Sequence, residues 1–566
     1  MAALKTMKGQ PVPDIQSMAA LGAWGRNPNH IAEQLTVKYC KAPNLGLPEP
    51  YMVEVPVLAK SNADCAVSVC VRQIAMFLPH DWFAWMGSDD LSDEARELVT
   101  GFGALADFWE AHDRDDPKLD KNPLCKQRDM VKFLPLVVHG DGGTFQRTDS
   151  INVVSMRSLL SAGNVGCSQL LLVALPKACI SKSTNLEQDT MHAIWTVLVW
   201  SFRALFEGQH PDTDHLGKAW PVASRRRGVQ GQTLHPEKNK AFIFALSGDG
   251  EWFQNEYKLK GSSMNECCFN CKADKSDIPF NDFRPDAKWR STTIKHRGTC
   301  PTEHLLSKIP GVVGETFAYD SLHILEEGVA AHALGNCFFD FVLKPGWAGT
   351  QDAKLRQLFH KVLQQYQELG IDGSNRIARL TLANFCNPKS KFSNFPCLTG
   401  LKARQIRYLV PCVLEICRAE EEPTIAYTQH RRACLQHLEE MYQCMDTGLL
   451  HFDKDTIRKY QRSTNLCLQH YTKCCKICMG QNFMQWNIVH KHHLAAHMPA
   501  QAAFINPKYV TTYTGETMVG FMSSLAHACL NGTPPHLVPQ KVCWRFRLAL
   551  WFRLIGKDFG DPAEEE

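Results

Sequence analysis

The spacing of hydrophobic side chains along the chain separates an N-terminal part from everything after it. Residues 1–50 are rich in Pro, Gly and Asn and show no strong periodicity, so we expect a loosely ordered arm there. Over residues 63–112 the apolar positions, from Val67 to Phe108, follow a spacing that we interpret as helical. We therefore predict a mainly helical N-terminal region over residues 51–128.

Four short apolar runs then predict β-strands, with an amphipathic helix between the third run and the fourth. The strands are predicted at residues 133–139, 150–155, 169–175 and 240–246, and the helix at residues 190–206. The first and last strands each end at a Gly-Asp-Gly turn, which contains Asp141 in one case and Asp249 in the other. Strand, strand, strand, helix, strand is the order of the ribonuclease-H-like fold. We therefore predict an α/β protein whose ribonuclease-H-like core begins with residues 129–274.

Downstream of the fourth strand the pattern is mostly helical. Helical spacing recurs over residues 275–485, which we predict to be a large all-helical insertion in the core. Its predicted helices lie at residues 314–336, 355–369, 403–419 and 427–448. Residues 486–566 would complete the core, with a helix over residues 515–530 that begins just before Glu516.

Composition limits the class of protein without naming its partner. The chain is 44% hydrophobic and 21% charged, as is typical of globular proteins, and its net charge of +4 neither indicates nor excludes a nucleic-acid ligand. Its first residues lack the apolar stretch of a secretory signal, and the longest apolar stretch, residues 194–206, is too short to span a bilayer. We expect a nuclear or cytoplasmic protein that is not secreted and does not enter a membrane. In such a compartment, pairs among the 23 cysteines indicate metal binding rather than disulfides.

The acids at the strand ends predict a metal-dependent site. Cleavage of a phosphodiester needs an activated nucleophilic oxygen and a stabilised leaving oxygen, and two Mg²⁺ ions about 4 Å apart can provide both. Mg²⁺ prefers carboxylate oxygens and water, and in this fold a third carboxylate usually comes from a later helix. Asp141, Asp249 and Glu516 are therefore the predicted ligands of Mg²⁺ or Mn²⁺. A single Asp at a strand end is more often only a turn or cap residue, so the prediction depends on the pair.

A second metal site is predicted from cysteine and histidine spacing. Cys268-Phe-Asn-Cys271 follows Asp249 by 19 residues and can supply half of a tetrahedral zinc site. His493 and His497, four residues apart, lie on one face of a predicted helix and can supply the other half. His492 is an alternative ligand to His493. A surface histidine cluster without metal, and a site made only of cysteines at Cys474, Cys475 and Cys478, are the other interpretations.

Several motifs in this order resemble DDE transposases of the CACTA, Plavaka and KDZ transposon families, and more distantly the V(D)J recombinase core. The resemblance spans about residues 130–535. The motifs that carry it are Leu134-Pro-Leu-Val-Val-His-Gly-Asp141, Gly248-Asp249, Cys268-Phe-Asn-Cys271, Tyr319-Asp320-Ser-Leu-His323, Phe395-Pro-Cys-Leu-Thr-Gly-Leu-Lys-Ala-Arg404, Lys491-His-His493-Leu-Ala-Ala-His497-Met-Pro499 and Tyr513-Thr-Gly-Glu516. The chain departs from the families in two places. Residues 1–130 contain no zinc-finger pattern, and the residues directly after Glu516 are neither basic nor rich in Asn.

The resemblance implies metal-dependent cleavage and strand transfer of DNA, with transposon ends and target DNA as partners and a homo-oligomer as the working assembly. It also implies that His323 lies near the catalytic centre, where it could orient a phosphate, although His323 could equally be a buried structural histidine. Asp320 is the alternative to Asp249 as the second acid. The one basic run, Arg225-Arg226-Arg227, is expected in a loop, either as a DNA contact or as a solvated segment.

Three other functions remain open at the level of the sequence. A domesticated, catalytically inactive transposase derivative would keep the fold and the zinc and bind DNA or protein. A zinc-organised helical scaffold of unrelated origin would leave Asp141, Asp249 and Glu516 far apart. A structure-selective nuclease would share the metal site and differ only in its substrate.

Overall fold

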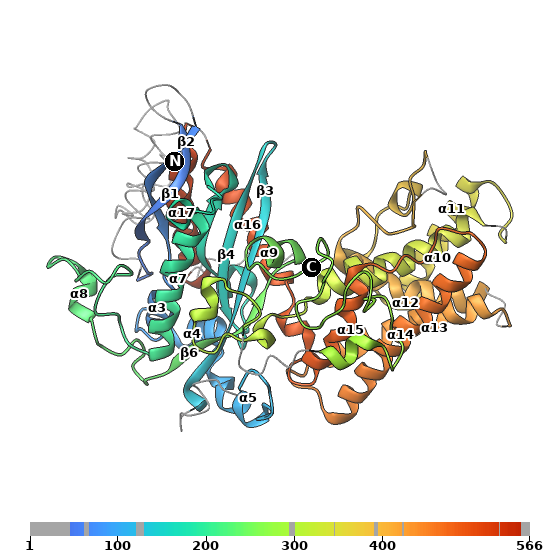
Figure 1. Cartoon of the computed structure of the whole chain (residues 1–566), viewed down its shortest axis with the longest axis horizontal. Coiled ribbons are helices and arrows are strands. Elements are labelled where there is room, and N and C mark those ends of the chain that lie inside the picture. The colour runs from blue at the N-terminus through green and yellow to red at the C-terminus, as the bar shows by residue number, and fades with distance from the viewer. Residues whose placement is uncertain are drawn as a thin grey trace, which may run out of the picture. The chain divides into compact units, whose positions relative to one another are not determined.

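The computed structural model describes residues 46–60, 67–119, 130–293, 300–344, 346–389, 394–420, 424–530 and 532–555 (Figure 1). Most of the predicted N-terminal arm, residues 1–45, lies outside the described residues. The described chain forms a mixed α/β protein with a small sheet and a large helical region toward the C-terminus. Within the described part, no helix is both long and apolar enough to cross a lipid bilayer.

The chain divides into two compact units. Unit 1 contains residues up to Gly103, residues 141–241 and residues 517–565, and unit 2 contains residues 104–140 and 242–516. The division falls inside three continuous elements, namely β3 (Phe133–Gln146), β6 (Lys240–Ser247) and α16 (Tyr513–His527). Each unit is therefore described by itself.

Unit 1 begins with a β-hairpin, which corrects the helical prediction for this part of the chain. β1 (Tyr51–Lys60) pairs antiparallel with β2 (Val67–Met76), in a register that places Tyr51 opposite Met76. Residues 67–71 alternate valine with other residues, and alternating β-branched side chains favour a strand rather than a helix. The helical prediction is correct only from residue 79 onward, where α3 (Pro79–Met86), α4 (Asp93–Thr100) and, in unit 2, α5 (Leu105–Ala111) follow.

The four predicted core strands are present and form one sheet. The sheet has the order β5-β4-β3-β6, with β4 at Asp149–Ser158 and β5 at Leu170–Pro176. β4 and β5 are antiparallel, and their register shifts between Val154 and Ser155. β5 is buried along its whole length, as its uninterrupted apolar sequence predicts.

Helices of unit 1 cover its strands. The predicted helix between the third and fourth strands is α7 (Thr190–Glu207), which begins at the cap residue Asp189 and ends at Gly208 in a left-handed conformation. α7 packs against α3 and β1, and α17 (Val538–Ile555) packs against β2 and β5. The short helices α6 (Val165–Ser168) and α8 (Arg225–Val229) lie in the connections.

Unit 2 is mainly helical, as predicted for residues 275–485. Its larger helices are α10 (Ala331–Leu343), α11 (Gln351–Glu368), α12 (Ala403–Glu420), α13 (Ala426–Met445), α14 (Lys454–Gly480) and α15 (His490–Ala502). α13 and α14 pack against each other along their length. The apolar faces of these helices form one continuous core, which includes Phe338, Leu438 and Trp486.

The segment predicted as a helix over residues 314–336 is not one regular α-helix. It contains a short 3₁₀ turn at Gly314–Thr316, and then the π-helix η12 (Leu322–Ala330), which continues directly into α10. π-Helical turns are rare and occur frequently at functional sites. η12 packs against α12 and α15 of the same unit.

Candidate functional site

Two cysteines and two histidines of unit 2 form a buried cluster with the composition of a zinc site. Each of Cys268, Cys271, His493 and His497 offers one ligand atom, and these atoms all lie within 4.8 Å of one another. Cys268 Sγ lies 3.6 Å from His497 Nε2, Cys271 Sγ lies 3.2 Å from His493 Nε2, and the two Nε2 atoms are 3.2 Å apart. A Cys₂His₂ set converging in this way could hold a metal ion such as zinc.

Local structure explains why these four side chains meet. The two histidines are four residues apart on α15 and therefore project from one face of the helix. The two cysteines lie in a tight loop, where the backbone N–H of Asn270 donates to Cys268 Sγ at 3.3 Å and that of Ala273 donates to Cys271 Sγ at 3.4 Å. Such N–H donors favour the thiolate form, which is the form that binds metals.

The surroundings of the cluster fix its histidines. His493 Nδ1 lies 3.0 Å from the carbonyl oxygen of Phe280, which orients the ring so that Nε2 faces the cysteines. The Trp289 ring packs at 4.7 Å from the His493 ring and 5.1 Å from the His497 ring, measured between centroids. Hydrogen bonding with Cys271 and with the two histidines holds the pKa of Cys268 well below its usual range, against the effect of burial. The same surroundings would favour binding of a cation by the Cys268 sulfur.

The alternative ligands do not join this cluster. His492 is fully buried on another side of α15, where its ring packs 4.3 Å from Tyr471 and its Nδ1 is near the backbone of Val489. Among the described residues, Cys474, Cys475 and Cys478 do not form a group of three potential ligands. The structure thus favours His493 over His492 and the mixed site over the site made only of cysteines.

Asp249 has a structural role in the chain as it stands. It precedes α9 (Gly250–Asn255), and its Oδ1 accepts a hydrogen bond from the backbone N–H of Trp252 at 2.5 Å. This N-cap arrangement is the ordinary use of an Asp before a helix. Among the described residues, Asp249 does not belong to a group of three or more potential metal ligands. Within the described part of the chain this is the one hydrogen bond of the Asp249 side chain, and it leaves Oδ2 able to accept a ligand.

Asp141 lies inside a strand and not at its end. The prediction placed a turn at Gly140-Asp141-Gly142-Gly143, but β3 continues through these residues to Gln146. The strand can pass here because glycines permit close approach by neighbouring segments. In unit 1, a Cβ at Gly143 would lie 2.4 Å from Val519 of α16. Side chains two residues apart on a strand share a face, so Asp141 is on the same face of β3 as His139.

In unit 2, His139 of β3 meets the first turn of α16. A ligand nitrogen of His139 and a carboxylate oxygen of Glu516 lie within 4.8 Å. A Cβ at Gly515 would be 2.3 Å from the His139 ring, so only glycine permits this contact. Helix α16 begins at Tyr513, and Glu516 is therefore in its first turn, as an acidic residue at a helix N-terminus prefers.

All three candidate acids are preceded by glycines that make close contacts. A Cβ at Gly140 would lie 2.3 Å from the Trp252 ring, and a Cβ at Gly248 would lie 2.8 Å from the Gly140 carbonyl oxygen. Together with Gly515, these glycines allow β3, β6 and α16 to approach closely beside the acids. The Gly-Asp and Gly-Glu pairs in the sequence therefore have a packing reason that is independent of metal binding.

Asp320 is buried and its carboxylate is saturated with hydrogen bonds. Oδ1 accepts from Thr511 Oγ1 at 2.9 Å, from Thr512 N at 2.9 Å and from Leu322 N at 3.2 Å. Oδ2 accepts from Thr512 Oγ1 at 2.8 Å, from His323 N at 3.1 Å and from His323 Nδ1 at 2.6 Å. Burial alone would raise the pKa of Asp320, but these donors lower it below its usual range. A carboxylate with six donors has no lone pair left for a metal, which argues against Asp320 as the second acid.

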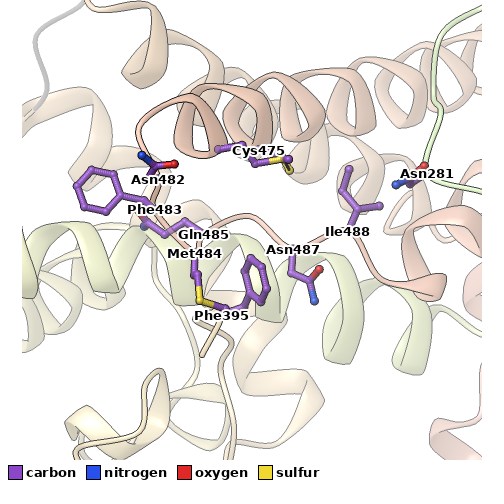
Figure 2. Close-up of a pocket in the computed structure, with 10 residues that line it drawn as sticks. Asn281, Phe395, Cys475, Asn482, Phe483, Met484, Gln485, Asn487 and Ile488 are labelled. Atoms are coloured by element: carbon purple, nitrogen blue, oxygen red, sulfur yellow. Dashed lines mark hydrogen bonds between the residues drawn. The ribbon is translucent and has the colours of Figure 1, made fainter. Parts of the chain in front are cut away.

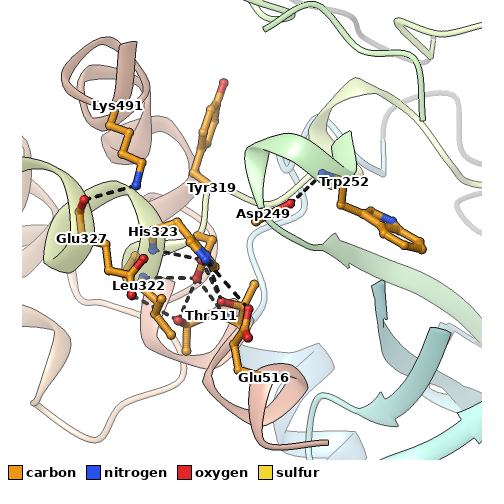
Figure 3. A network of polar contacts seen from close by, with 12 residues as sticks. Asp249, Trp252, Tyr319, Leu322, His323, Glu327, Lys491, Thr511 and Glu516 are labelled. Carbon is orange, nitrogen blue, oxygen red and sulfur yellow. Dashed lines mark hydrogen bonds and ion pairs between the residues drawn. The ribbon is translucent and has the colours of Figure 1, made fainter. Parts of the chain in front are cut away.

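His323 links Asp320 to Glu516 (Figure 3). Its Nδ1 bonds Asp320, and its Nε2 lies 3.8 Å from Glu516 Oε1. Burial would lower the pKa of His323, but the hydrogen bond to Asp320 raises it to about 9, so the ring is an imidazolium at neutral pH. The side chain is 20% exposed, so this cation can still be reached from solvent.

The arginine run is only partly available for DNA. It forms the short helix α8 and not a loop. Arg226 makes two contacts with the carboxylate of Asp81, at 2.9 and 2.7 Å, in the wall of a pocket of about 540 Å³ in unit 1. Arg225 and Arg227 are exposed. Of the three arginines, these two therefore remain as candidate phosphate contacts.

A pocket of about 430 Å³ in unit 2 is lined by apolar side chains and uncharged amides (Figure 2). Its lining contains no charged side chain, and consists of Asn281, Phe395, Cys475, Met479, Asn482, Phe483, Met484, Gln485, Asn487 and Ile488. It is therefore not a candidate for acid, base or metal chemistry.

Comparison with known proteins does not indicate a function for this chain, so the proposal below is based on the geometry of the site. No protein-family model matches the chain, and no curated protein matches it. Three residues of the site are not among those predicted from the sequence, namely His139, Thr511 and Thr512. His139 could have been found, since it lies two residues before Asp141 in a predicted strand and so shares its face. Thr511 and Thr512 carry no signal in the sequence that would link them to Asp320, 191 and 192 residues away.

Proposed function

We propose that this protein cleaves and joins DNA strands in a metal-dependent reaction, as a transposase of the DDE type does. The observation that carries the proposal is the position of Glu516 within unit 2, where its carboxylate lies close both to His139 of the central strand β3 and to His323. A carboxylate between a histidine and an imidazolium suits the binding of a phosphodiester. The carboxylate can bind cations, and the imidazolium can donate a hydrogen bond to a phosphate oxygen.

The topology supports a ribonuclease-H-like core. The first core strand β3 is adjacent to the last, β6, in the order β5-β4-β3-β6, and α7 lies between the third and fourth strands along the chain. In such a core the central strand and its neighbour supply acids for one site. This arrangement is what the assignment of Asp141 and Asp249 requires.

Asp141, Asp249 and Glu516 are the proposed ligands of Mg²⁺ or Mn²⁺. Carboxylate oxygens suit both ions. Bound divalent ions would supply Lewis-acid activation of the attacking oxygen and stabilisation of the leaving oxygen. Asp249 would hold its helix cap through Oδ1 and bind metal through Oδ2.

The reaction has two chemically similar steps. In the first, a water oxygen attacks a phosphorus atom at a transposon end, and the bond to the 3′-oxygen breaks, leaving a 3′-hydroxyl after protonation. In the second, that 3′-oxygen attacks a phosphorus atom of the target DNA and loses its proton to solvent, while the bond from that phosphorus to the target strand's own 3′-oxygen breaks and the released oxygen takes up a proton. His323, held as a cation by Asp320, would donate hydrogen bonds from Nε2 to a phosphate oxygen in both steps.

Zinc at Cys268, Cys271, His493 and His497 is proposed to be structural. Four protein ligands complete a tetrahedral shell and leave no open position for substrate. The ion would tie α15 to the loop after α9, and so hold the helical region against the strand that ends at Ser247. A nuclear location and a homo-oligomer that brings two DNA ends together belong to the same proposal.

A catalytically inactive, DNA- or protein-binding derivative is the second candidate. Two observations favour it: the cap formed by Asp249 and the neutralisation of Arg226 by Asp81. Both place a predicted functional residue in a structural contact. This candidate keeps the fold and the zinc and loses only the chemistry.

A strand-nicking assay separates the two candidates. Purified protein is incubated with supercoiled plasmid in Mg²⁺ or Mn²⁺, and nicked product is measured for the wild type and for Asp141→Asn and Glu516→Gln. We expect nicking by the wild type and a loss of at least about 100-fold in each variant, as for removal of a group that stabilises the transition state. Glu187→Gln, on an exposed turn of unit 1, is the matched control and should nick normally. Nicking that survives both substitutions would reject the proposed site, and no nicking by the wild type would favour the inactive derivative.

A further inference from the structure

Tyr319 connects the Cys₂His₂ cluster with the Asp320–His323 pair. It is the residue immediately before Asp320, and its ring lies nearly parallel to the ring of the cluster residue His497 and to the ring of Phe269. The Tyr319 and His497 rings are inclined by 11° with centroids 5.9 Å apart, and the Tyr319 and Phe269 rings by 19° with centroids 5.7 Å apart. Phe269 lies between Cys268 and Cys271, so the loop that carries the cysteines and one histidine of the cluster both pack against the Tyr319 ring.

Gln501 makes a second connection, through the backbone. Its Oε1 accepts a hydrogen bond from the Tyr319 N–H at 2.7 Å, and its Nε2 donates to the Tyr319 carbonyl oxygen at 3.2 Å. Gln501 is four residues after His497 on α15 and therefore lies on the same face of the helix. Two opposed hydrogen bonds fix both the position and the orientation of the peptide groups that lead into Asp320.

A third contact joins the N-terminal end of α15 to the π-helix that carries His323 (Figure 3). Lys491 Nζ donates to the carbonyl oxygen of Glu327 at 3.1 Å. The Lys491 side chain also lies against Gly328, where an added Cβ would be 3.0 Å from it. The two ends of α15, the helix that supplies both histidines of the cluster, therefore contact the chain on either side of the Asp320–His323 pair.

We propose that Gln501 is a positioning residue, which with Tyr319 transmits the placement of α15 in the metal cluster to the Asp320–His323 pair. Zinc then does more than stabilise the fold. Loss of the ion would allow α15 to move, and the peptide group between Tyr319 and Asp320 would move with it. The inference concerns the placement of the pair. It rests on the proposed function only in giving His323 a role at DNA.

Hydrogen exchange at backbone amides tests this proposal without any DNA. The amides of Thr512 and His323 donate to Asp320, so their protection reports how well the pair is held. Exchange is followed by mass spectrometry for the wild type and for Gln501→Met, and zinc content is measured on the same samples. Gln443→Met, at an exposed position of α13 in the same unit, is the control of matched chemistry.

We expect Gln501→Met to retain zinc and to lose protection of these two amides at least tenfold, while amides of α11 are unchanged. Zinc removal from the wild type by a chelator should produce the same local loss. Gln501→Glu keeps the acceptor for the Tyr319 N–H and should restore part of the protection. Full protection in Gln501→Met, or in the zinc-free wild type, would overturn the proposal. If Gln501→Met also loses zinc, the Gln501→Glu variant provides the test. Protection of the Thr512 and His323 amides below that of the wild type, at full zinc content, supports the proposal, and protection equal to that of the wild type rejects it.

Discussion

The imidazole of His323 donates a hydrogen bond of 2.6 Å from Nδ1 to the carboxylate of Asp320. The acid and the base are three residues apart at the start of a π-helix, and five further donors from Thr511, Thr512 and the local backbone complete the shell of Asp320. The Asp320 carboxylate thereby stabilises the imidazolium of His323 and has no lone pair left for a metal ion.

Replacing Asp320 should therefore destabilise the protein strongly. In Asp320→Ala the side chains of Thr511, Thr512 and His323 lose their buried acceptor, and we expect the free energy of unfolding to fall by about 3–5 kcal/mol. Urea unfolding followed by fluorescence measures the change. Asp372→Ala removes a solvent-exposed cap from the same unit and should cost much less stability than Asp320→Ala. Similar small losses in both variants would contradict the structural role of Asp320.

Metal binding by the Cys₂His₂ cluster can be tested by composition. Cys268→Ser and His497→Ala should each reduce bound zinc from about one ion per chain to a small fraction, because a structural site with three ligands binds far more weakly. Metal content after gel filtration, measured by mass spectrometry, gives the result. Cys475→Ser, which alters the rival cysteine cluster, should leave zinc unchanged. Zinc loss in Cys475→Ser with retention in Cys268→Ser would reverse the assignment.

The two proposed roles of Asp249 can be separated by substitution. Serine caps helices nearly as well as aspartate, so Asp249→Ser should keep the stability of the wild type, whereas Asp249→Ala should lose about 1 kcal/mol. A hydroxyl is a poor substitute for a metal-binding carboxylate, and we expect nicking by Asp249→Ser to fall at least about 100-fold. If Asp249→Ser nicks DNA at the normal rate, Asp249 is only a cap.

Close packing beside Glu516 predicts opposite effects for two glycines of α16. In Gly515→Ala the new Cβ would overlap the His139 ring, and we expect a loss of about 1–3 kcal/mol of stability. Gly520→Ala, on the same helix, meets no atom within 4 Å and should stabilise the protein by about 0.5–1 kcal/mol. Thermal unfolding of the two variants checks the pair. A stabilised Gly515→Ala would show that His139 does not lie against the helix.

Glu326 predicts a dependence of stability on pH. Burial in the π-helix raises the pKa of its carboxyl group from 4.5 to about 8, although Arg407 partly opposes this. Between these two pH values the folded state holds a proton on Glu326 that the unfolded state has released. The contribution of this group to the free energy of unfolding is therefore highest below pH 4.5 and falls as pH rises toward 8. Near the middle of this window the slope due to this group approaches about 1.4 kcal/mol per pH unit.

Glu326→Gln removes the titrating group and should flatten this part of the profile. We expect the variant to gain most over the wild type at pH 8 and least at pH 5, as measured by urea unfolding across the range. Glu187→Gln, at an exposed position, should reproduce the slope of the wild type. An equal slope in the wild type and Glu326→Gln would show that the pKa of Glu326 is not raised.

The sequence by itself predicted several helices and strands and the four members of the Cys/His cluster. Apolar runs predicted β4, β5, β6 and α7 within a few residues, because a buried strand or amphipathic helix must show its period locally. The i, i+4 spacing of His493 and His497 and the Cys-x-x-Cys spacing indicated the cluster, since each half of it lies within a single local element, but only the structure separated His493 from His492 and the mixed cluster from Cys474, Cys475 and Cys478.

Only the tertiary structure decided how distant segments use their side chains. The prediction of helix is wrong for the alternating valines of β2, because the apolar positions of the helices that follow have helical spacing and lie in the same stretch of sequence. β3 passes through Gly140 and Gly143 as a strand because other segments pack where side chains would be. His139, Gly515 and the two threonines at Asp320 are brought to the site by contacts across hundreds of residues. A sequence period describes one element's own faces, and the partner that each face meets is set by the packing of the whole fold.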